Sequence, residues 1–231
     1  MIAGAFRKLL PNHPVPVRVW CGPFRGARVM MNPRNSMRKI FGLYEHELNA
    51  WINTVLRKVA NVVDVGANDG YFTFGCAAAF RRLRKAGEIV AFEPMEQHFQ
   101  SLRRSVSVQP AGVQISLCQD LVGREVRPGM TTLDRVQWRT GGSGGGKGAL
   151  IKIDVEGAEM EVLAGATSWL NCSNYFLIEV HNKPFIEDIT RVFAERGLAL
   201  QRVNQRPLKF IGREAREREN WWLVSSLDSE C

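Results

Sequence analysis

Long apolar runs are missing from this sequence. No stretch of about 18 consecutive apolar residues occurs anywhere in its 231 residues, so no segment is suited to cross a membrane as a helix. The first residues, MIAGAFRKLLPNHPVPV, also lack the long apolar segment of a secretory signal. These two absences predict a protein without a membrane span that resides in the cytoplasm.

Paired cysteines are missing as well. No CxxC motif occurs, and the five cysteines are scattered along the chain: Cys21, Cys76, Cys118, Cys172 and Cys231. An odd number of unpaired thiols argues against a disulfide framework and against a cysteine-bound zinc site. We therefore expect reduced thiols, which also fits a cytoplasmic protein.

Acidic residues are fewer than basic residues. Lysine and arginine number 31 against 23 acidic residues, which gives a formal net charge of +8. Basic residues cluster between Arg81 and Lys85 and again between Arg213 and Arg218. Solvated helix faces explain such clusters, and an anionic partner such as nucleic acid is the alternative. No RNA-binding motif supports that alternative, and the sequence does not indicate an oligomeric state.

The chain does contain an alternation of short apolar strands and amphipathic helices. Strands are predicted at Asn61–Val65, Glu88–Phe92, Val113–Leu117, Ala149–Val155, Tyr175–Val180, Leu198–Val203 and Trp221–Val224. Helices are predicted at Glu45–Val59, Gly70–Arg84, Pro94–Val106, Ala158–Leu170 and Pro184–Arg196. This alternation favours an α/β fold with a doubly wound, mostly parallel sheet spanning residues 45–231. Residues 1–44 are predicted to be an N-terminal extension with a short β-hairpin, Val15–Trp20 and Ala27–Met31.

A glycine-rich run, RTGGSGGGKG, resembles most of a nucleotide-binding P-loop. A P-loop follows a strand and opens a helix, so that the helix N-terminus meets the phosphates. Here the glycines precede a strand, and Gly148 stands where a serine or threonine would bind magnesium. We therefore interpret Gly141–Gly148 as an exposed linker without a phosphate contact.

A second glycine turn, in VVDVGANDGYFTF, does lie between a strand and a helix. We expect Gly66 and Gly70 to let the backbone approach a ligand, where a Cβ atom would obstruct it. Asp64 and Asp69 flank the turn and would repel a pyrophosphate. Glu93 ends the next strand, where a carboxylate can accept hydrogen bonds from both ribose hydroxyls. A nucleoside with positive charge and no phosphates fits this pattern, and S-adenosylmethionine (SAM) is such a molecule.

Five segments in this order, VVDVGANDGYFT, VAFEP, TTLD, LIKIDVEGAEMEVLAGA and FLIEVH, resemble the FkbM family of SAM-dependent methyltransferases. The resemblance covers roughly residues 38–181 and implies a class I, Rossmann-like fold with seven strands and an antiparallel last hairpin. It implies O-methylation, often of sugar or other natural-product hydroxyls. The resemblance implies cofactor contacts at Asp64, Gly66, Asn68, Gly70 and Glu93. We add Ala67 of the same turn, Asp120 for the adenine loop and Asp154.

Ionisable residues interrupt two of the predicted strands. Alternation places Lys152, Asp154 and Glu156 on one face of the Ala149–Val155 strand, and it places Leu177, Glu179 and His181 together on the next strand. A buried charge requires a partner, which favours a pair between Lys152 and Glu179.

We interpret Asp154 as a contact of the methionine ammonium or of a substrate hydroxyl, and His181 as the catalytic general base. A divalent metal bound by Asp154, Glu179 or His181 is compatible with this chemistry, although the spacing does not require one.

The sequence therefore predicts a SAM-dependent O-methyltransferase that acts on a hydroxyl of a small molecule or glycosyl group. An RNA or protein methyltransferase is the alternative that the net charge would serve. A SAM-binding module without catalysis is the alternative outside the enzymes, and the histidine at position 181 argues against it.

Overall fold

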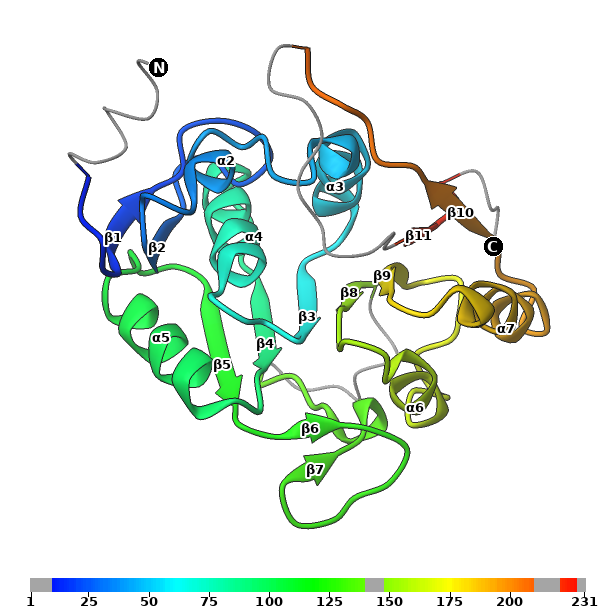
Figure 1. The fold of residues 1–231 in the computed structure, drawn as a ribbon. Helices are drawn as coiled ribbons and strands as arrows, with labels where there is room; N and C mark the ends of the chain where they lie inside the picture. The colour runs from blue at the N-terminus through cyan, green and yellow to red at the C-terminus, as the bar shows by residue number, and fades with distance from the viewer. Residues whose placement is uncertain (1–9, 140–147, 210–220, 228–231) are drawn as a thin grey trace.

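A seven-stranded sheet forms the centre of the protein (Figure 1). The computed structural model describes residues 10–139, 148–209 and 221–227. Across the sheet the strands follow the order β10-β11-β9-β8-β3-β4-β5. Their bounds are β3 Asn61–Val65, β4 Glu88–Phe92, β5 Gln114–Cys118, β8 Ala149–Ile153, β9 Tyr175–Val180, β10 Leu200–Val203 and β11 Trp221–Ser225.

The strand directions complete the class I methyltransferase topology. Strands β5, β4, β3, β8 and β9 are parallel neighbours, and β11 runs antiparallel to both β9 and β10. Strand β3 occupies the middle, and the chain leaves it first towards β4 and later towards β8. The predicted fold class is confirmed, including the antiparallel final hairpin. The carboxyl ends of β3, β4 and β8 consequently meet at one edge, where ligands bind in such sheets.

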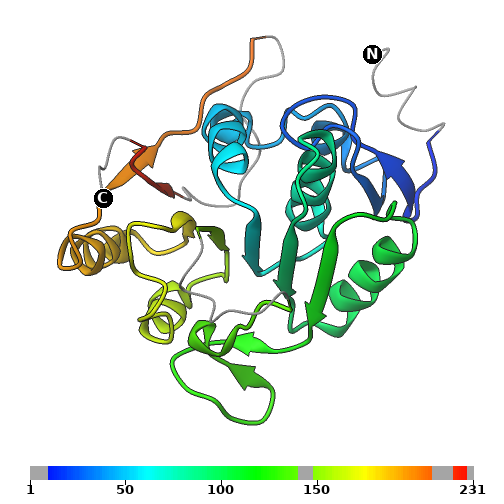
Figure 2. The ribbon, with the colours of Figure 1, turned by 180° about the vertical axis from the view of Figure 1, so that it is seen from behind.

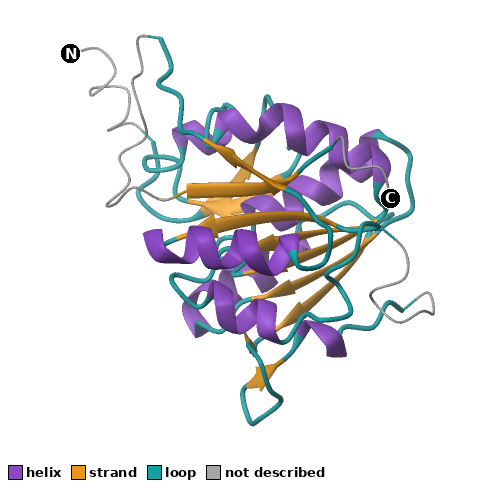
Figure 3. Cartoon of the chain, turned by 90° about the vertical axis from the view of Figure 1, so that its right-hand side faces the viewer, coloured by secondary structure: helices purple, strands orange, loops and turns teal. Residues whose placement is uncertain are grey.

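Helices cover both faces of the sheet, as the side view in Figure 3 shows. One core cluster joins the sheet to α3 Asn49–Lys58, α4 Tyr71–Arg82 and α5 Glu96–Ser107. The other joins the opposite face to α6 Glu159–Ala164 and α7 Lys183–Ala194. Alternation along β8 explains the division, because Leu150 packs into the first cluster and Ile151 and Ile153 into the second. Among the described residues, no helix is long and apolar enough to cross a membrane.

The N-terminal residues pack closely on the first helical layer. Strands β1 Val15–Arg18 and β2 Arg28–Met31 pair antiparallel beside α5 (Figure 2), followed by α2 Met37–Ile40 and the 3₁₀ turn His46–Leu48. The backbone N–H of Met30 donates to the Ser105 hydroxyl at 2.9 Å. Phe24 is 4% exposed and makes an edge contact with Tyr71. The extension therefore shares the core of the main sheet, and a domain boundary at residue 44 stays a prediction.

Among the predicted elements that end earlier than the sequence pattern indicated, β8 and α6 lie beside the ends of the central strands. Strand β8 stops at Ile153, and Glu156 has a left-handed backbone with φ 53°. Helix α6 stops at Ala164 rather than near Leu170, because Gly165 packs against the chain at Gly123. A Cβ atom on Gly165 would lie 2.0 Å from the Gly123 carbonyl oxygen. Two short strands that the pattern missed, β6 Leu121–Val122 and β7 Met130–Thr131, pair in this region, ahead of the 3₁₀ turn Leu133–Arg135.

The predicted glycine linker lies almost wholly outside the described residues. Only Gly148 of the Gly141–Gly148 run is described, and it immediately precedes β8. Gly148 therefore leads into a strand and not into a helix, which is the arrangement that argued against a P-loop.

Candidate functional site

A cavity of about 300 Å³ lies at the carboxyl ends of β3, β4 and β8. Its polar lining includes Gly66, Asn68, Glu93, Asp120, Asp154 and Glu156. These residues come from four separate stretches of the sequence, and five of the six were predicted as site residues. The structure therefore gathers Asn68, Glu93, Asp120 and Asp154 around one space, while their role in binding a cofactor stays a prediction.

The charge of this cavity is one-sided. Four carboxylates line it, from Glu93, Asp120, Asp154 and Glu156, and its described lining contains neither lysine nor arginine. Among the described lining residues, His98 is the one that can carry a positive charge, and its Nδ1 lies 3.7 Å from Glu93 Oε1. Such a lining suits a ligand with positive charge and is unfavourable for phosphates.

The glycine turn is held close to β8. Gly66 has φ 80°, and a Cβ atom there would lie 1.8 Å from the Asp154 carbonyl oxygen. At Gly70, with φ 83°, a Cβ atom would meet the Phe74 ring at 2.4 Å. We expected these glycines to admit a ligand, but in both cases the protein itself fills the space. Gly66 still lines the cavity, whereas Gly70 precedes helix α4 as its N-cap residue and is outside the described lining.

Glu93 fixes the shape of the cavity wall. Its carboxylate accepts a hydrogen bond from the Asn68 backbone N–H at 2.8 Å and another from Met95 N–H at 3.0 Å. The first bond ties the end of β4 to the glycine turn, where Asn68 has a left-handed backbone with φ 49°. Glu93 is only 4% exposed yet lines the cavity, so its remaining acceptor capacity faces inward.

Asp64 and Asp69, which flank the glycine turn, lie outside the described lining of this cavity. Asp64 is fully buried beneath the turn, where it accepts a hydrogen bond from the Thr73 hydroxyl at 2.5 Å. Asp69 pairs with Lys39 at 2.5 Å and accepts the Tyr71 N–H. Neither residue is in the lining of the cavity, so the acidic character of the site comes from its own four carboxylates instead.

Lys152 links the buried carboxylates to the site. Its ammonium group lies 2.9 Å from Asp154 Oδ2 and 3.6 Å from Asp64 Oδ1, and it donates to the Gly66 carbonyl at 3.2 Å. The strand register places Lys152 opposite Leu177, and the carboxylates found beside it are those of Asp154 and Asp64, so the predicted pair with Glu179 stays a prediction.

The electrostatics of this buried group follow from its contacts. Burial works against the charged form of Lys152, but Asp154 and Asp64 together raise the pKa of Lys152. Burial likewise opposes ionisation of Asp154, and Lys152 more than offsets it, so the pKa of Asp154 is lowered. For Asp64 burial prevails over Lys152 and the pKa is raised. Asp154 is therefore the ionised partner that faces the cavity.

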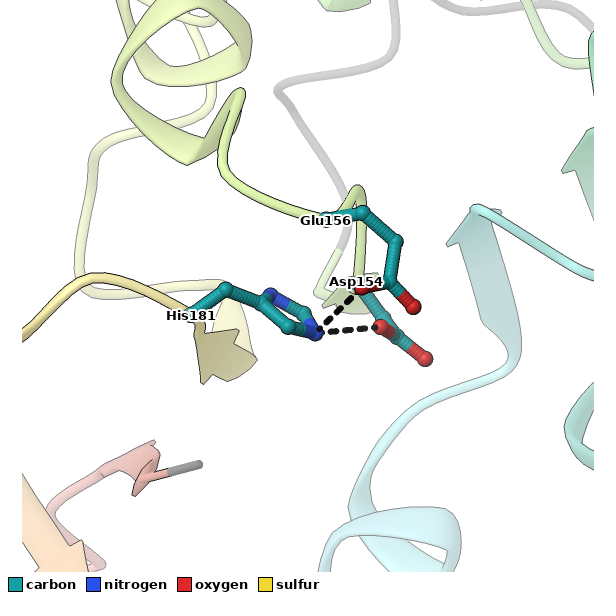
Figure 4. A group of neighbouring side chains, drawn as sticks. All are labelled: Asp154, Glu156 and His181. Atoms are coloured by element: carbon teal, nitrogen blue, oxygen red, sulfur yellow. Dashed lines mark ion pairs between the residues drawn. The ribbon is translucent and has the colours of Figure 1, made fainter. Parts of the chain in front are cut away.

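His181 follows the last residue of β9 and turns towards the end of β8. Its Nε2 atom lies 3.7 Å from Asp154 Oδ1 and 3.4 Å from Glu156 Oε2 (Figure 4). His181 is not among the described residues that line the cavity, and it stands behind these two carboxylates. Burial opposes protonation of His181, yet the bond to Glu159 and the nearby carboxylates raise the pKa of His181.

Glu159 is a site residue that the sequence analysis missed. It is fully buried in the first turn of α6, and its Oε1 atom lies 2.6 Å from Nδ1 of His181. The same oxygen accepts a hydrogen bond from the Gly157 N–H at 3.0 Å. Helical spacing puts Glu159 on the same face as the buried Val162 and Leu163, and this placement of a carboxylate on an apolar face was the signal that could have revealed it. Glu159 fixes the orientation of the imidazole ring.

A larger cavity of about 740 Å³ lies at the opposite edge of the sheet. Its lining includes Asn61, Glu88 and Gln114, the first residues of β3, β4 and β5. Ligands of doubly wound sheets bind at the carboxyl ends of the strands, and the cluster around His181 lies there. The smaller cavity is therefore the candidate site.

Comparison with known proteins finds a match between part of this chain and a methyltransferase family. Residues 114–199 match the family model described as Methyltransferase FkbM domain. The matched segment contains Asp120, Asp154, Glu159 and His181. The resemblance to the FkbM family is thereby confirmed over these residues.

One curated relative is the hexuronic acid methyltransferase AglP of Haloferax volcanii. It is 36% identical over 52 residues, a match that covers 22% of this chain and 22% of the relative. The match thus spans well under two thirds of that protein, and the activity in its name is not transferred to this chain by the match itself.

Solved structures with a similar arrangement have low sequence identity. The precorrin-6y C5,15-methyltransferase of Geobacter metallireducens GS-15 is 12% identical, with a TM-score of 0.48, over 81% of this chain and 88% of that chain. The C-terminal domain of the precorrin-6Y C5,15-methyltransferase of Rhodobacter capsulatus is 14% identical, with a TM-score of 0.47, over 73% of this chain and 80% of that chain.

Proposed function

We propose that this protein is a SAM-dependent O-methyltransferase that acts on a hydroxyl of a small molecule or glycosyl group. The observation that carries the proposal is the cavity lined by four carboxylates and by no described lysine or arginine. SAM has a sulfonium and an ammonium group and no phosphate, so it complements this lining where a phosphorylated nucleotide does not.

The cofactor is proposed to lie across the ends of β3, β4 and β8. Glu93 would accept the ribose hydroxyls, as carboxylates do at the end of this strand in doubly wound folds. Asp120 lines the same cavity, in the segment proposed to contact adenine. Asp154, at the end of β8, would face the methionine ammonium. This orientation brings the methyl-bearing sulfur towards the cluster of Asp154, Glu156 and His181.

The cluster is proposed to ionise the acceptor hydroxyl. The hydroxyl oxygen attacks the methyl carbon in line with the sulfur, the carbon–sulfur bond breaks, and its electron pair remains on the sulfur. The hydroxyl proton must leave during this step, and His181 is the residue predicted to receive it. A sugar acceptor is supported by the FkbM match and by the hexuronic acid in the name of the relative from Haloferax volcanii.

A methyl-transfer assay tests the proposal. The purified chain would be incubated with methyl-labelled SAM and separate pools of neutral sugars, uronic acids, other natural-product alcohols, RNA and protein. We expect label on an alcohol or sugar pool and formation of S-adenosylhomocysteine. Label on RNA or protein alone would show that the acceptor is a macromolecule and not a sugar or small-molecule alcohol. If calorimetry detects no binding of SAM, the proposal is wrong. If SAM binds but no methyl group is transferred to any pool, a non-catalytic SAM-binding module is favoured.

A further inference from the structure

Three side chains at the end of the sheet converge on one space. Asp154 and Glu156 follow β8, His181 follows β9, and one ligand atom from each lies within 4.8 Å of the others. Figure 4 shows the imidazole Nε2 directed towards both carboxylates. The three residues therefore offer two oxygens and one nitrogen around a common point.

The distances are too long for direct hydrogen bonds. A hydrogen bond from an N–H to an oxygen measures about 2.7–3.2 Å, whereas Nε2 lies 3.7 Å from Asp154 Oδ1 and 3.4 Å from Glu156 Oε2. Atoms that bind one cation together are held apart by about this much, because each contacts the ion rather than its neighbour. The spacing fits three ligands of a single ion.

Glu159 supplies an independent observation. Its carboxylate contacts Nδ1 of His181 at 2.6 Å, so a proton on Nδ1 leaves the lone pair of Nε2 free towards the two carboxylates. Metal-binding histidines are commonly held in this way by a carboxylate on the other ring nitrogen. Glu159 is fully buried, and its Oε2 atom has no hydrogen-bond partner among the described residues. A buried carboxylate aimed at the cluster in this way adds negative charge that a nearby cation would offset.

The ammonium group of Lys152 does not neutralise the carboxylate oxygens that face His181. Lys152 contacts Asp154 through Oδ2, while Oδ1 of the same carboxylate faces His181. Lys152 is also shared with the buried Asp64. In the part of the chain that the structure describes, the ion pairs of Asp154 Oδ1, Glu156 and Glu159 are with the imidazole of His181 and not with a lysine.

We propose that Asp154, Glu156 and His181 bind a divalent cation of the Mn²⁺ class, with Glu159 as a positioning residue. Two carboxylates and one imidazole form a mixed oxygen and nitrogen donor set, which suits such an ion and leaves coordination positions open. Because Asp154 and Glu156 also line the cofactor cavity, the open positions face the proposed methyl group.

The cation would define the class of acceptor. An acceptor that offers a hydroxyl beside a second oxygen, as in a vicinal diol or a hydroxy acid, can fill two open positions at once. The cation lowers the pKa of the bound hydroxyl, its proton passes to solvent, and the oxygen electron pair forms the bond to the methyl carbon. His181 would then act as a ligand rather than as a free base. This acceptor class rests on the proposed methyl transfer, whereas binding of the cation does not.

Calorimetric titration with Mn²⁺ tests the site without cofactor or acceptor. The full chain would first be treated with a chelator and dialysed. We expect one Mn²⁺ per chain, with an affinity at least about 10-fold weaker in Glu156→Gln and in Glu159→Gln. Glu156 has a side chain that is 86% exposed, so its substitution is not expected to unfold the protein. Glu161→Gln is the matched control, because Glu161 lies on the same helix and pairs with Arg124 at the surface. Equal Mn²⁺ affinity in all three variants, or no binding by the parent chain, would overturn the proposal.

Parallel measurements separate this inference from the proposed function. SAM affinity and methyl transfer would be measured with chelator and with added Mn²⁺. If methyl transfer continues undiminished in chelator and no Mn²⁺ binds, the proposed cation site is wrong and the proposed methyltransferase function stands. If the parent chain binds Mn²⁺, Glu156→Gln does not, and no acceptor is methylated, the cation site is supported and the proposed function is wrong. We expect transfer to require Mn²⁺ and to favour acceptors with adjacent oxygens.

Discussion

His181 and Glu159 form a contact of 2.6 Å between Nδ1 and Oε1 at the end of strand β9. The carboxylate is fully buried and comes from helix α6, so its position is set by the core rather than by solvent. Glu159 therefore decides which nitrogen of His181 faces Asp154 and Glu156. Whether Nε2 accepts a proton or binds a cation, its action depends on this second carboxylate.

The first prediction concerns this contact. Glu159→Gln keeps the size of the side chain but removes the charge that holds the imidazole, so we expect turnover to fall by about 10–100-fold. SAM affinity should change little, because Glu159 does not line the described cavity. Turnover and the dissociation constant for SAM would be compared with those of Glu161→Gln on the same helix. A loss confined to SAM affinity would show that Glu159 does not act through His181.

The second prediction concerns Glu93. Glu93→Ala removes a carboxylate that is proposed to accept hydrogen bonds from the ribose hydroxyls. Loss of hydrogen bonds to a charged acceptor should weaken SAM binding by about 1.5–3 kcal/mol. The structure adds a further cost, because the N–H groups of Asn68 and Met95 lose their acceptor as well. Calorimetry should show weaker SAM binding, with Glu96→Ala at the surface of α5 as the control. Unchanged SAM affinity in Glu93→Ala would contradict the assignment.

The fold could be predicted from the sequence because its strands are short, apolar and bounded by turns. The bounds of β3, β4 and β9 agree with the prediction, since each is a short and mostly buried run that ends at a glycine or a polar residue. The end of β8 was wrong by two residues. The run from Ile153 to Val155 continues the alternation in sequence, yet the chain turns at Glu156 with a left-handed backbone that no pattern marks.

The site was predicted less completely, because contacts between distant residues are invisible in one sequence. Strand-end position was enough to select Glu93, Asp154 and His181. Charge pairing was predicted less well, because the sequence pattern indicated only Glu179 as a partner of Lys152 and did not reveal its ion pairs with Asp154 and Asp64. Glu159 was missed because helical spacing places it in the core, where a carboxylate is expected only with a partner that the sequence does not show.

The third prediction concerns the glycine turn. Gly66→Ala would place a Cβ atom 1.8 Å from the Asp154 carbonyl oxygen in a backbone with φ 80°. Gly129→Ala has a comparable φ of 72° but meets nothing within 4 Å. We expect Gly129→Ala to lower the free energy of unfolding by about 1–2 kcal/mol from backbone strain alone. Gly66→Ala should exceed this by several kcal/mol, because the clash involves backbone on both sides. The free energies of unfolding would be measured by urea denaturation. Equal decreases in the two variants would show that the turn at Gly66 relaxes without strain.

The fourth prediction concerns stability in acid. Partial burial works against ionisation of Asp134, yet four hydrogen bonds from Thr167 and Ser168 hold the pKa of Asp134 below its ordinary value of 3.8. A carboxyl with a lowered folded pKa stabilises the protein above the unfolded pKa, and the effect is lost as the pH falls through the folded pKa. Asp134→Asn should therefore reduce the free energy of unfolding at neutral pH and approach the parent value in strong acid. A difference that is constant with pH would contradict this role.

The fifth prediction separates the two residues proposed to act at the reacting atoms. His181→Ala should lower turnover by roughly 10²–10⁴-fold, the usual contribution of a group that ionises the nucleophile. SAM affinity should change little, because His181 stands behind Asp154 and Glu156 and outside the described cavity lining. Part of the activity should return at high pH, where the acceptor hydroxyl ionises unaided.

Asp154→Asn should instead weaken both SAM binding and turnover. Asp154 lines the cofactor cavity, contacts Lys152 through one oxygen and faces His181 through the other, so loss of its charge disturbs the cofactor and the reacting group together. Calorimetry with SAM and steady-state turnover against pH would be measured for both variants. Asp188→Asn, on the exposed surface of α7, serves as the control. Full activity in His181→Ala would end the case for this histidine, and unchanged SAM affinity in Asp154→Asn would move the methionine ammonium away from β8.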